Sequence, residues 1–485
     1  MLAVFPLTNR PRGSSRRNGG CGVALAVFAG CLMAAASASA QGAGAGAAPA
    51  AVAPAATDAG KGPARLVLTP LTAADLALRN SIDLQIDAKA IEEAVARLRQ
   101  AESGGKLTGD VSAKLAWSGP ITSLTLPGPN NTTETFALAP LFSQTETLSL
   151  NQPLYTGGRV PAQRNLAKRG IDLAKTQPSV TARTTALAAE SLTYNVLRLA
   201  QLYDVSIQSA TATEEHLKLS QKLYDAGTVA RFEVIQAETE LAQAQGDVIG
   251  ARVAVEQGKA SLREVLVIPQ TTDIDVQEGV PLKIPEGRLP QLVETAWQQR
   301  PEMTLAEANV RVAEATLRVT EQSLNLSAAA FAQYSRETAS ALSGAESWTA
   351  GFQITKPLFD GGLQKGQLEE QRAKIAEAKL SVESARQQIA LDVTQQYLAL
   401  GQAQEQLTVA QAGEVDARER LRIARVRFES GVSLGIEVLD ARTSLASASA
   451  SVVNARFNLQ TAVVELRSAM GINDVGGVRS NEKAH

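Results

Sequence analysis

The chain has 485 residues, too many for one ordinary compact domain, and it is 45% hydrophobic but only 4% aromatic. Both cysteines lie within the first 40 residues, together with four arginines and no acidic residue. Beyond that segment, 43 basic residues stand against 49 acidic ones, which disfavours binding to nucleic acid or another polyanion. The same remainder has no cysteine and two histidines, which excludes disulfides, cysteine zinc sites and thiol catalysis, and disfavours a Ser-His-Asp enzyme.

Residues 1–40 have the pattern of an export signal. A basic start precedes the apolar run Val23–Ala36, and Ala38-Ser39-Ala40 then offers a small-residue cleavage site before Gln41. The apolar run is too short to span a bilayer. We therefore expect a signal peptide cleaved between Ala40 and Gln41. An alternative stays open, because Phe28-Ala29-Gly30-Cys31 resembles a lipoprotein box in which Cys31 would carry the lipid.

The rest of the chain repeats itself after about 204 residues. Pro153-Leu154-Tyr155-Thr156-Gly157-Gly158 returns as Pro357-Leu358-Phe359-Asp360-Gly361-Gly362, and three further pairs of segments recur in the same order. This tandem duplication predicts six segments: a signal peptide (1–40), a disordered Ala/Gly/Pro-rich segment (41–65), a first repeat (66–268), a linker (269–288), a second repeat (289–472) and a tail (473–485).

Most of each repeat has helical periodicity. From Ala441 to Leu466, apolar residues recur in alternating steps of four and three, the period of supercoiled helices. This stripe alone fits an ordinary two-stranded coiled coil, but its many alanines also suit a wall that is one helix thick. The sequence predicts long helices at about 364–428 and about 161–225, and Pro178 should kink or break the latter.

Two shorter regions, at about 106–152 and about 326–357, show broken period-two alternation and predict one β-hairpin each. Their loops are expected at about 119–140 and 338–346. A soluble hairpin is one interpretation. Alternating strands with Trp and Tyr near their ends also suit an outer-membrane wall. Because every backbone group must pair in such a wall, the sheet would have to close by oligomerisation, and four strands from each of three copies would give twelve.

Each repeat has glycines where the chain changes direction. Pro153 and Pro357 are expected to stop the strand ladder, and the pairs Gly157-Gly158 and Gly361-Gly362 then allow a sharp change of direction. Gly227 and Gly431 follow the long helices, where a C-terminal glycine can adopt a left-handed conformation. Thr228 and Ser433 could then cap the returning helices.

Taken together, these features resemble the TolC-like family of outer-membrane efflux and secretion channels. The resemblance covers roughly 70–475, and its most specific parts are the duplicated Pro-Leu-aromatic-x-Gly-Gly motif and the segment Phe428–Ala441. It implies a mainly α protomer with a small β part. Three copies would form a twelve-stranded outer-membrane β-barrel, continued by a long α-helical coiled-coil barrel across the periplasm.

The resemblance also assigns expected roles to residues. Pro153, Gly157, Gly158, Pro357, Gly361 and Gly362 would form the swivel between barrel and helices. Gly227, Thr228, Gly431 and Val432 would form hairpin tips that meet a periplasmic adaptor. Glu437, Asp440 and their counterpart Glu233 would ring the periplasmic aperture, although acidic residues in a first helical turn are also favoured by the helix dipole alone. Phe428 and Ser433 stand where relatives use a locking Tyr and Arg.

The function implied is a passive exit duct, without enzymatic activity or cofactor, for drug efflux or type I secretion. It would connect an inner-membrane transporter, through the adaptor, to the outside, and it would contact outer-membrane lipid. A second class, an exported coiled-coil scaffold or adaptor, is disfavoured because adaptors carry one helical hairpin flanked by β domains. An enzyme is disfavoured because no His/Cys/Asp cluster or phosphate-binding glycine loop occurs. The transported substrate is not readable from the sequence.

Overall fold

The computed structural model describes residues 65–117, 119, 123–127, 133–137, 142–280, 282–339, 342–430, 432–433 and 435–472. The expected signal peptide and its cleavage site, residues 41–64 of the Ala/Gly/Pro-rich segment, and the expected tail lie outside these residues. The described part is mainly helical, with one four-stranded sheet and two small strand pairs.

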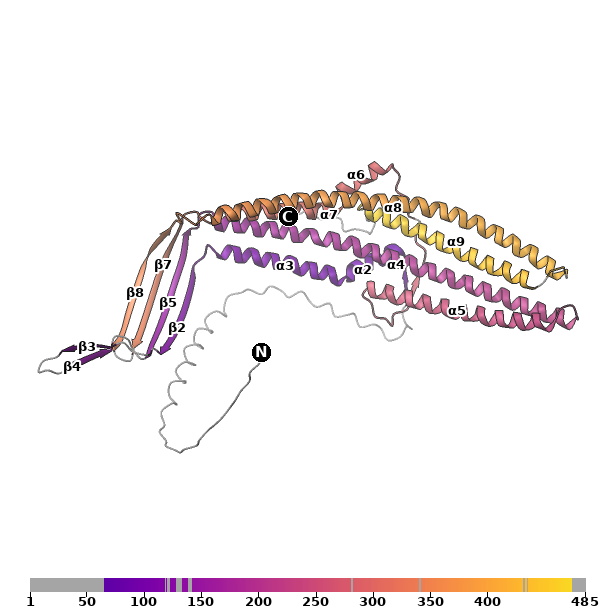
Figure 1. Ribbon diagram of the computed structural model, residues 1–485, viewed down its shortest axis with the longest axis horizontal. Helices are drawn as coiled ribbons and strands as arrows, with labels where there is room; N and C mark the ends of the chain where they lie inside the picture. The colour runs from indigo at the N-terminus through magenta and orange to yellow at the C-terminus, as the bar shows by residue number, and fades with distance from the viewer. Residues whose placement is uncertain are drawn as a thin grey trace, which may run out of the picture. The chain divides into compact units, whose positions relative to one another are not determined.

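The main sheet has the strand order β2-β5-β7-β8, and every neighbouring pair is antiparallel (Figure 1). Its strands are β2 (Thr108–Trp117), β5 (Phe142–Tyr155), β7 (Ser327–Ala339) and β8 (Leu342–Thr355). The pairs β2–β5 and β7–β8 therefore lie where the sequence predicted hairpins, and β5–β7 joins the two repeats. Within the described chain, β2 and β8 each have one unpaired edge.

Both predicted loops need correction. The first contains a hairpin of its own, formed by β3 (Ser123–Pro127) and β4 (Thr133–Ala137). The second, expected at 338–346, is mostly strand, since β7 runs to Ala339 and β8 starts at Leu342. Sequence alternation is weak at 338–346 because this stretch carries mainly small residues, so pairing with the neighbouring strand decides its conformation.

The sheet has two different faces, because the side chains of a strand alternate between them. One face carries the exposed apolar side chains of Val111, Leu115, Trp117, Leu148, Leu150, Tyr334, Trp348, Phe352 and Ile354. A few polar residues, such as Arg336 and Glu346, interrupt this face toward the hairpin loops. The other face carries mainly Ser, Thr, Asn, Gln and charged residues. Apolar side chains that face outward need a partner other than water.

Eight helices occur in the described part. The four long ones are α4 (Arg159–Asp225), α5 (Arg231–Val265), α8 (Leu363–Glu429) and α9 (Gly435–Ala469). The four short ones are α2 (Pro70–Asn80), α3 (Ile82–Ser103), α6 (Leu289–Gln299) and α7 (Pro301–Glu321). The 67 residues of α4 and of α8 each correspond to about 100 Å at ~1.5 Å per residue. Within the described residues, no helix is both long enough and apolar enough to cross a membrane.

The helices pack as a single layer. Near the sheet, α4 packs between α3 and α7, and α7 also packs against α8. Farther from the sheet, α4 packs between α5 and α9, and α9 packs against α8, as Figure 1 shows. α3 and α5 have α4 as their main helical neighbour, so the outer flank of α8 and the flanks of α3 and α5 are uncovered. This arrangement is a wall one helix thick rather than an isolated two-stranded coiled coil.

Pro178 does not break the helix in which it lies, which was one of the two predicted effects, because α4 continues through it as one element. Proline removes one backbone hydrogen bond from the helix ladder. α4 packs against α3 and α7, and we attribute its continuity across the missing bond to this lateral packing.

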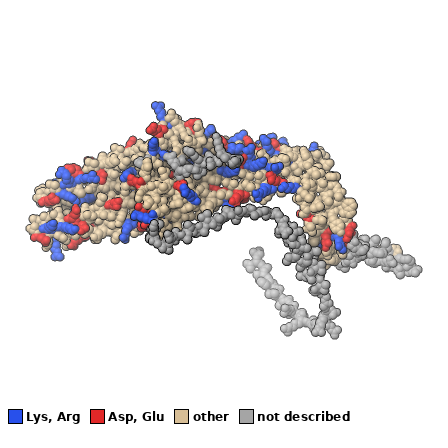
Figure 2. Space-filling view, turned by 180° about the vertical axis from the view of Figure 1, so that it is seen from behind, with Lys and Arg blue, Asp and Glu red and all other residues tan. Residues whose placement is uncertain are grey.

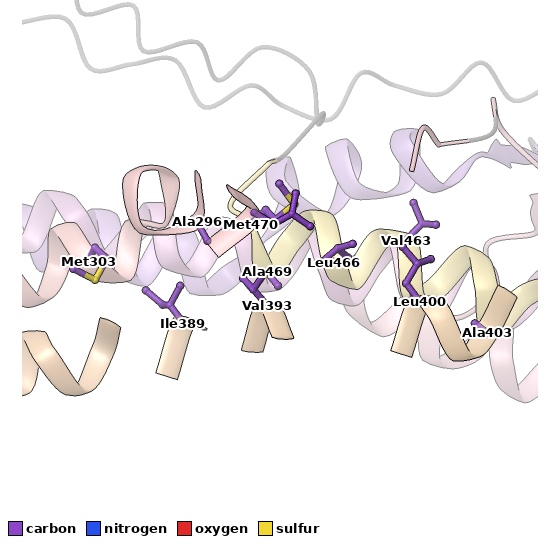
Figure 3. Packing of buried hydrophobic residues seen from close by; sticks show 12 residues of the cluster. Ala296, Met303, Ile389, Val393, Leu400, Ala403, Val463, Leu466, Ala469 and Met470 are labelled. Carbon is purple, nitrogen blue, oxygen red and sulfur yellow. The ribbon is translucent and has the colours of Figure 1, made fainter. Parts of the chain in front are cut away.

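The buried core is a chain of small clusters rather than one large centre. The largest lies where α6 and α7 meet α8 and α9, and it includes Ile389, Val393, Leu466 and Met470 (Figure 3). A second cluster joins α2, α4 and the end of α5 to the parallel pair of β1 (Leu66–Leu68) and β6 (Ile274–Val276). The expected linker thus contains a strand that ties it to the start of the first repeat.

Candidate functional site

The junction between sheet and helices contains the duplicated proline-glycine motif. Gly157 and Gly361 both have φ of +63°, and Gly158 and Gly362, the N-caps of α4 and α8, have φ of +88° and +90°. These values lie in the left-handed region, which favours glycine. The two junctions therefore have the same backbone conformation, and the chain turns there from strand into long helix.

Pro153 differs from the expectation that it stops the strand ladder, whereas Pro357 follows the end of its strand. Pro153 lies inside β5, where it still opposes Ala329 of β7, and the register shifts between Pro153 and Tyr155. On the other side, β2 pairs no further than Asn151. The proline therefore coincides with the end of pairing on one edge and with an irregularity on the other. Pro357 lies beyond the last residue of β8, Thr355.

At the end of the wall far from the sheet, two tight turns connect α4 to α5 and α8 to α9. After α4, Gly227 has φ of +76° and donates its amide to the Tyr224 carbonyl at 2.8 Å, while the Thr228 amide binds the Leu223 carbonyl at 2.9 Å. This is the glycine-terminated motif predicted for the first tip. After α8, the Val432 amide binds the Arg427 carbonyl at 2.9 Å, the equivalent bond, whereas Gly431 lies outside the described residues.

The predicted helix caps at these turns are wrong. The Thr228 hydroxyl donates to the Leu223 carbonyl at 2.8 Å, so it closes the end of α4, and α5 begins after Ala230 without a side-chain cap. The Ser433 hydroxyl is buried and has no hydrogen-bond partner among the described residues. Proximity in sequence suggested a cap, but the tight turn directs the Thr228 hydroxyl back toward α4.

The three candidate aperture carboxylates do not form one cluster within the chain. Glu437 and Asp440 are exposed on the first turns of α9, and Glu437 lies 3.5 Å from Arg427 of α8. Glu233 is partly buried, and its carboxylate lies directly against Gly435, the first residue of α9. The backbone amides at a helix start favour such a negative charge. Glu233 therefore links the two tips and is partly buried, whereas Glu437 and Asp440 are exposed.

A buried core supports the tips, and sequence reasoning did not identify it. Phe428 packs with Leu421, Ala424 and Val438, and its ring lies 5.5 Å from that of His216 on α4. Phe428 thus stabilises the interior of the tip, at the position that the family resemblance associated with a lock.

Charged groups surround this core beside a cavity of about 140 Å³. Burial, with the charges of Arg442 and Arg425, lowers the pKa of His216 to about 4. Burial, with the charge of Arg425, lowers the pKa of Arg442 to about 10. Glu215 of α4 and Glu240 of α5 act on Arg442 in the opposite direction. These residues come from four helices and have no common spacing, so no sequence signal could have revealed them.

A second polar network lies midway along the wall. Arg300, between α6 and α7, donates to both oxygens of Glu302 at 3.1 and 3.2 Å, and to Asp392 of α8 at 2.9 Å. Arg183 of α4 reaches Glu302 at 2.5 Å and Ser468 of α9 at 3.0 Å. Burial raises the pKa of Glu302, but hydrogen bonds from Arg300 and the charges of both arginines outweigh it, so the pKa is lowered. The network joins four helices from both repeats.

The sheet and the helices differ in the charge of their surfaces. On the face seen in Figure 2, Lys/Arg and Asp/Glu side chains are interspersed over the helices, whereas the sheet is largely free of them. Trp117 and Phe142 contact each other on neighbouring strands, with tilted rings whose centroids lie 5.2 Å apart, and Trp348 lies opposite Tyr334. Among the described residues, no group of three or more His, Cys, Asp or Glu side chains is arranged to hold a metal ion.

The chain is similar to known proteins over most of its length. A model of the outer membrane efflux protein family matches residues 73–266 and 292–472. The solvent efflux pump outer membrane protein SrpC of Pseudomonas putida is 25% identical over 423 residues, which are 82% of this chain and 84% of that protein. The toluene efflux pump outer membrane protein TtgI of Pseudomonas putida has the same identity and coverage.

Solved structures share the fold at lower identity. The CmeC outer membrane channel of Campylobacter jejuni has a TM-score of 0.65 and 17% identity, over 84% of this chain and 87% of its own. The open state of the MtrE outer membrane channel of Neisseria gonorrhoeae has a TM-score of 0.63 and 18% identity, over 83% and 89%.

Proposed function

The chain belongs to the outer membrane efflux protein family, and we propose on that basis that it is the outer-membrane exit duct of a tripartite efflux system. It conducts its substrate passively, from an inner-membrane transporter and a periplasmic adaptor to the outside. The relatives SrpC and TtgI are named as efflux pump proteins, which favours efflux over type I secretion.

The observation that carries the proposal is the two-faced sheet with open edges, joined to a wall one helix thick. An apolar outer face suits lipid, and a polar inner face suits a water-filled lumen. Backbone groups at an open edge cannot remain unpaired inside a bilayer, so the sheet must close on further copies. Three copies supply twelve strands, and their helical walls form the periplasmic tube.

The functional residues follow from this assembly. Glu437 and Asp440 of three chains ring the periplasmic aperture, and Glu233 adds to that charge from beside α9. Gly227, Thr228, Gly431 and Val432 form the tips that meet the adaptor. Pro153, Gly157 and Gly158, with Pro357, Gly361 and Gly362, form the swivel between barrel and tube. Support comes from the left-handed glycines and from the exposed carboxylates on α9.

Export precedes assembly. We expect removal of residues 1–40 and a mature protein that starts at Gln41, which intact mass measurement checks directly. A diacylglyceryl group on Cys31 would show instead that the chain is a lipoprotein.

Fractionation of cell membranes tests the proposed location and assembly together. The protein should co-sediment with outer membranes, and the detergent-extracted form should have the mass of three chains by light scattering. Recovery with inner membranes, or as a folded monomer, would contradict the proposal.

A further inference from the structure

The cavity beside Phe428 has no part in the proposed exit duct. It lies near the far ends of α4 and α8 (Figure 1) and has a volume of about 140 Å³. Its lining includes His216 of α4, Arg425 of α8 and Arg442 of α9. One water molecule needs only ~10–15 Å³ of such space, so the cavity has room for a small ion together with water.

The guanidinium group of Arg442 is poorly partnered by the protein. Its Nε and Nη1 atoms are buried and have no hydrogen-bond partner among the described residues. By contrast, the buried Arg263 donates to the Thr272 carbonyl at 2.9 Å. The buried Arg300 donates to Asp392, also at 2.9 Å. Because a buried cation without hydrogen-bond acceptors is costly, an acceptor beside Arg442 would be strongly favoured.

A second arginine adds positive charge to the same cavity. Arg425 contributes to the lining, and it forms no ion pair with any described residue. Burial, and after it the charge of Arg425, lowers the pKa of Arg442 to about 10, so the two cations repel each other. An anion between them would replace this repulsion by two attractions.

The carboxylates nearby do not take the place of such an anion. Glu215 and Glu429 line the cavity but are exposed, so water and salt screen their charges. Burial raises the pKa of Glu240 on α5, and its Oε2 atom also has no hydrogen-bond partner among the described residues. Within the described part of the chain, none of these three acids forms an ion pair with Arg425 or Arg442.

We infer that the tip cavity binds a small inorganic anion, of the size of chloride, between Arg425 and Arg442. The guanidinium N–H groups donate charge-assisted hydrogen bonds to it. Because the two arginines lie on α8 and α9 and His216 lies on α4, the anion joins both helical hairpins at the tip. All these residues belong to one chain, so the site stands or falls independently of the proposed duct.

The anion also acts on His216, which is 5% exposed. The helices packed around this histidine all contribute charged groups: Glu215 on α4, Glu240 on α5, Arg425 and Glu429 on α8, and Arg442 on α9. Burial, with the charges of the two arginines, lowers the pKa of His216 to about 4. An anion beside the arginines offsets their charges and so raises this pKa toward 6.5. Anion binding and proton binding at the tip therefore reinforce each other.

Titration of His216 tests this coupling. The chain has two histidines, so His485→Gln with ¹³C-labelled histidine leaves one imidazole signal in NMR spectra of the detergent-purified protein. Its pKa is measured in sodium chloride and in sodium gluconate at the same ionic strength, where screening is equal but the organic anion is much larger. We expect a pKa about one pH unit higher in chloride, which corresponds to about tenfold coupling between anion and proton.

The variants Arg425→Gln and Arg442→Gln should lose the difference between the two salts. The matched control is Arg422→Gln, because Arg422 lies on α8 but makes only an exposed pair with Glu419; this variant should keep the difference.

A second measurement needs no substitution. Amide exchange around Val438 in the unaltered chain should be roughly threefold slower in chloride than in gluconate at pH 7, because an anion that binds only the folded tip stabilises it. Equal pKa values of His216 and equal exchange in the two salts would overturn the inference. A salt difference that persists in Arg442→Gln, or that disappears in Arg422→Gln, would place the anion outside this cavity and overturn the site.

Discussion

Replacement of Arg300 by methionine should weaken the middle of the helical wall. The Arg300 side chain is 6% exposed and makes three hydrogen bonds to the carboxylates of Glu302 and Asp392. Removal of one partner from a fully buried pair costs about 3–5 kcal/mol. Asp392 is a third exposed and Arg183 still neutralises Glu302, so we expect about 2–3 kcal/mol here.

Amide hydrogen exchange at the start of α7 measures this loss. A cost of about 2–3 kcal/mol corresponds to exchange that is about 30- to 150-fold faster in the protected amides near Met303. Arg311→Met is the matched control, because Arg311 is on the same helix and makes only an exposed pair with Glu307 at 3.8 Å. Equal exchange in Arg300→Met and Arg311→Met would refute the claim that this network holds the helices together.

Three further results are expected. Gly157→Ala should lower the free energy of unfolding by about 2–4 kcal/mol, because a side chain there would be strained by the left-handed backbone and would also clash with Asn325. Gly227→Ala should lower it by only about 1 kcal/mol, because the backbone strain acts there without a clash. Thermal unfolding in detergent compares the two variants. The pKa of His216 is 6.5 in the unfolded chain but about 4 in the folded tip, so the stability of the tip should fall as the pH drops from 6.5 to 4. Amide exchange around Val438 measures this pH dependence, and His216→Leu should abolish the part that His216 causes. Glu437→Ala/Asp440→Ala should weaken cation selectivity and trivalent-cation block in planar bilayers without changing the trimer; unchanged selectivity would mean that these acids only stabilise the helix start.

The long-range plan of the protein was predictable because it repeats in the sequence. The duplicated Pro-Leu-aromatic-x-Gly-Gly motif marks both junctions, and its glycines have the left-handed angles that their residue type permits. The helix expected at about 364–428 is α8, Leu363–Glu429. Periodicity predicts such elements because each side chain's position on a helix follows from local geometry.

The errors occurred where contacts distant in sequence decide the structure. Pro178 was expected to kink or break a helix that in fact continues through it, with α3 and α7 packed against it. Thr228 is a local exception, because it was expected to cap α5 but its hydroxyl binds the carbonyl of Leu223, five residues earlier at the end of α4. The Arg300 network was missed because its members are isolated in the sequence and meet only when four helices pack. Glu233 was equated with Glu437 by the repeat, yet the neighbouring α9 gives it a different environment.

Ion conductance of the purified trimer in planar lipid bilayers tests the central claim most directly. A trimeric exit duct should produce discrete conductance steps, with cations carrying more of the current than anions because carboxylates ring the aperture. Trimeric protein that inserts into the bilayer and leaves its conductance unchanged would contradict the account, since a closed wall without a water-filled path could not conduct substrate.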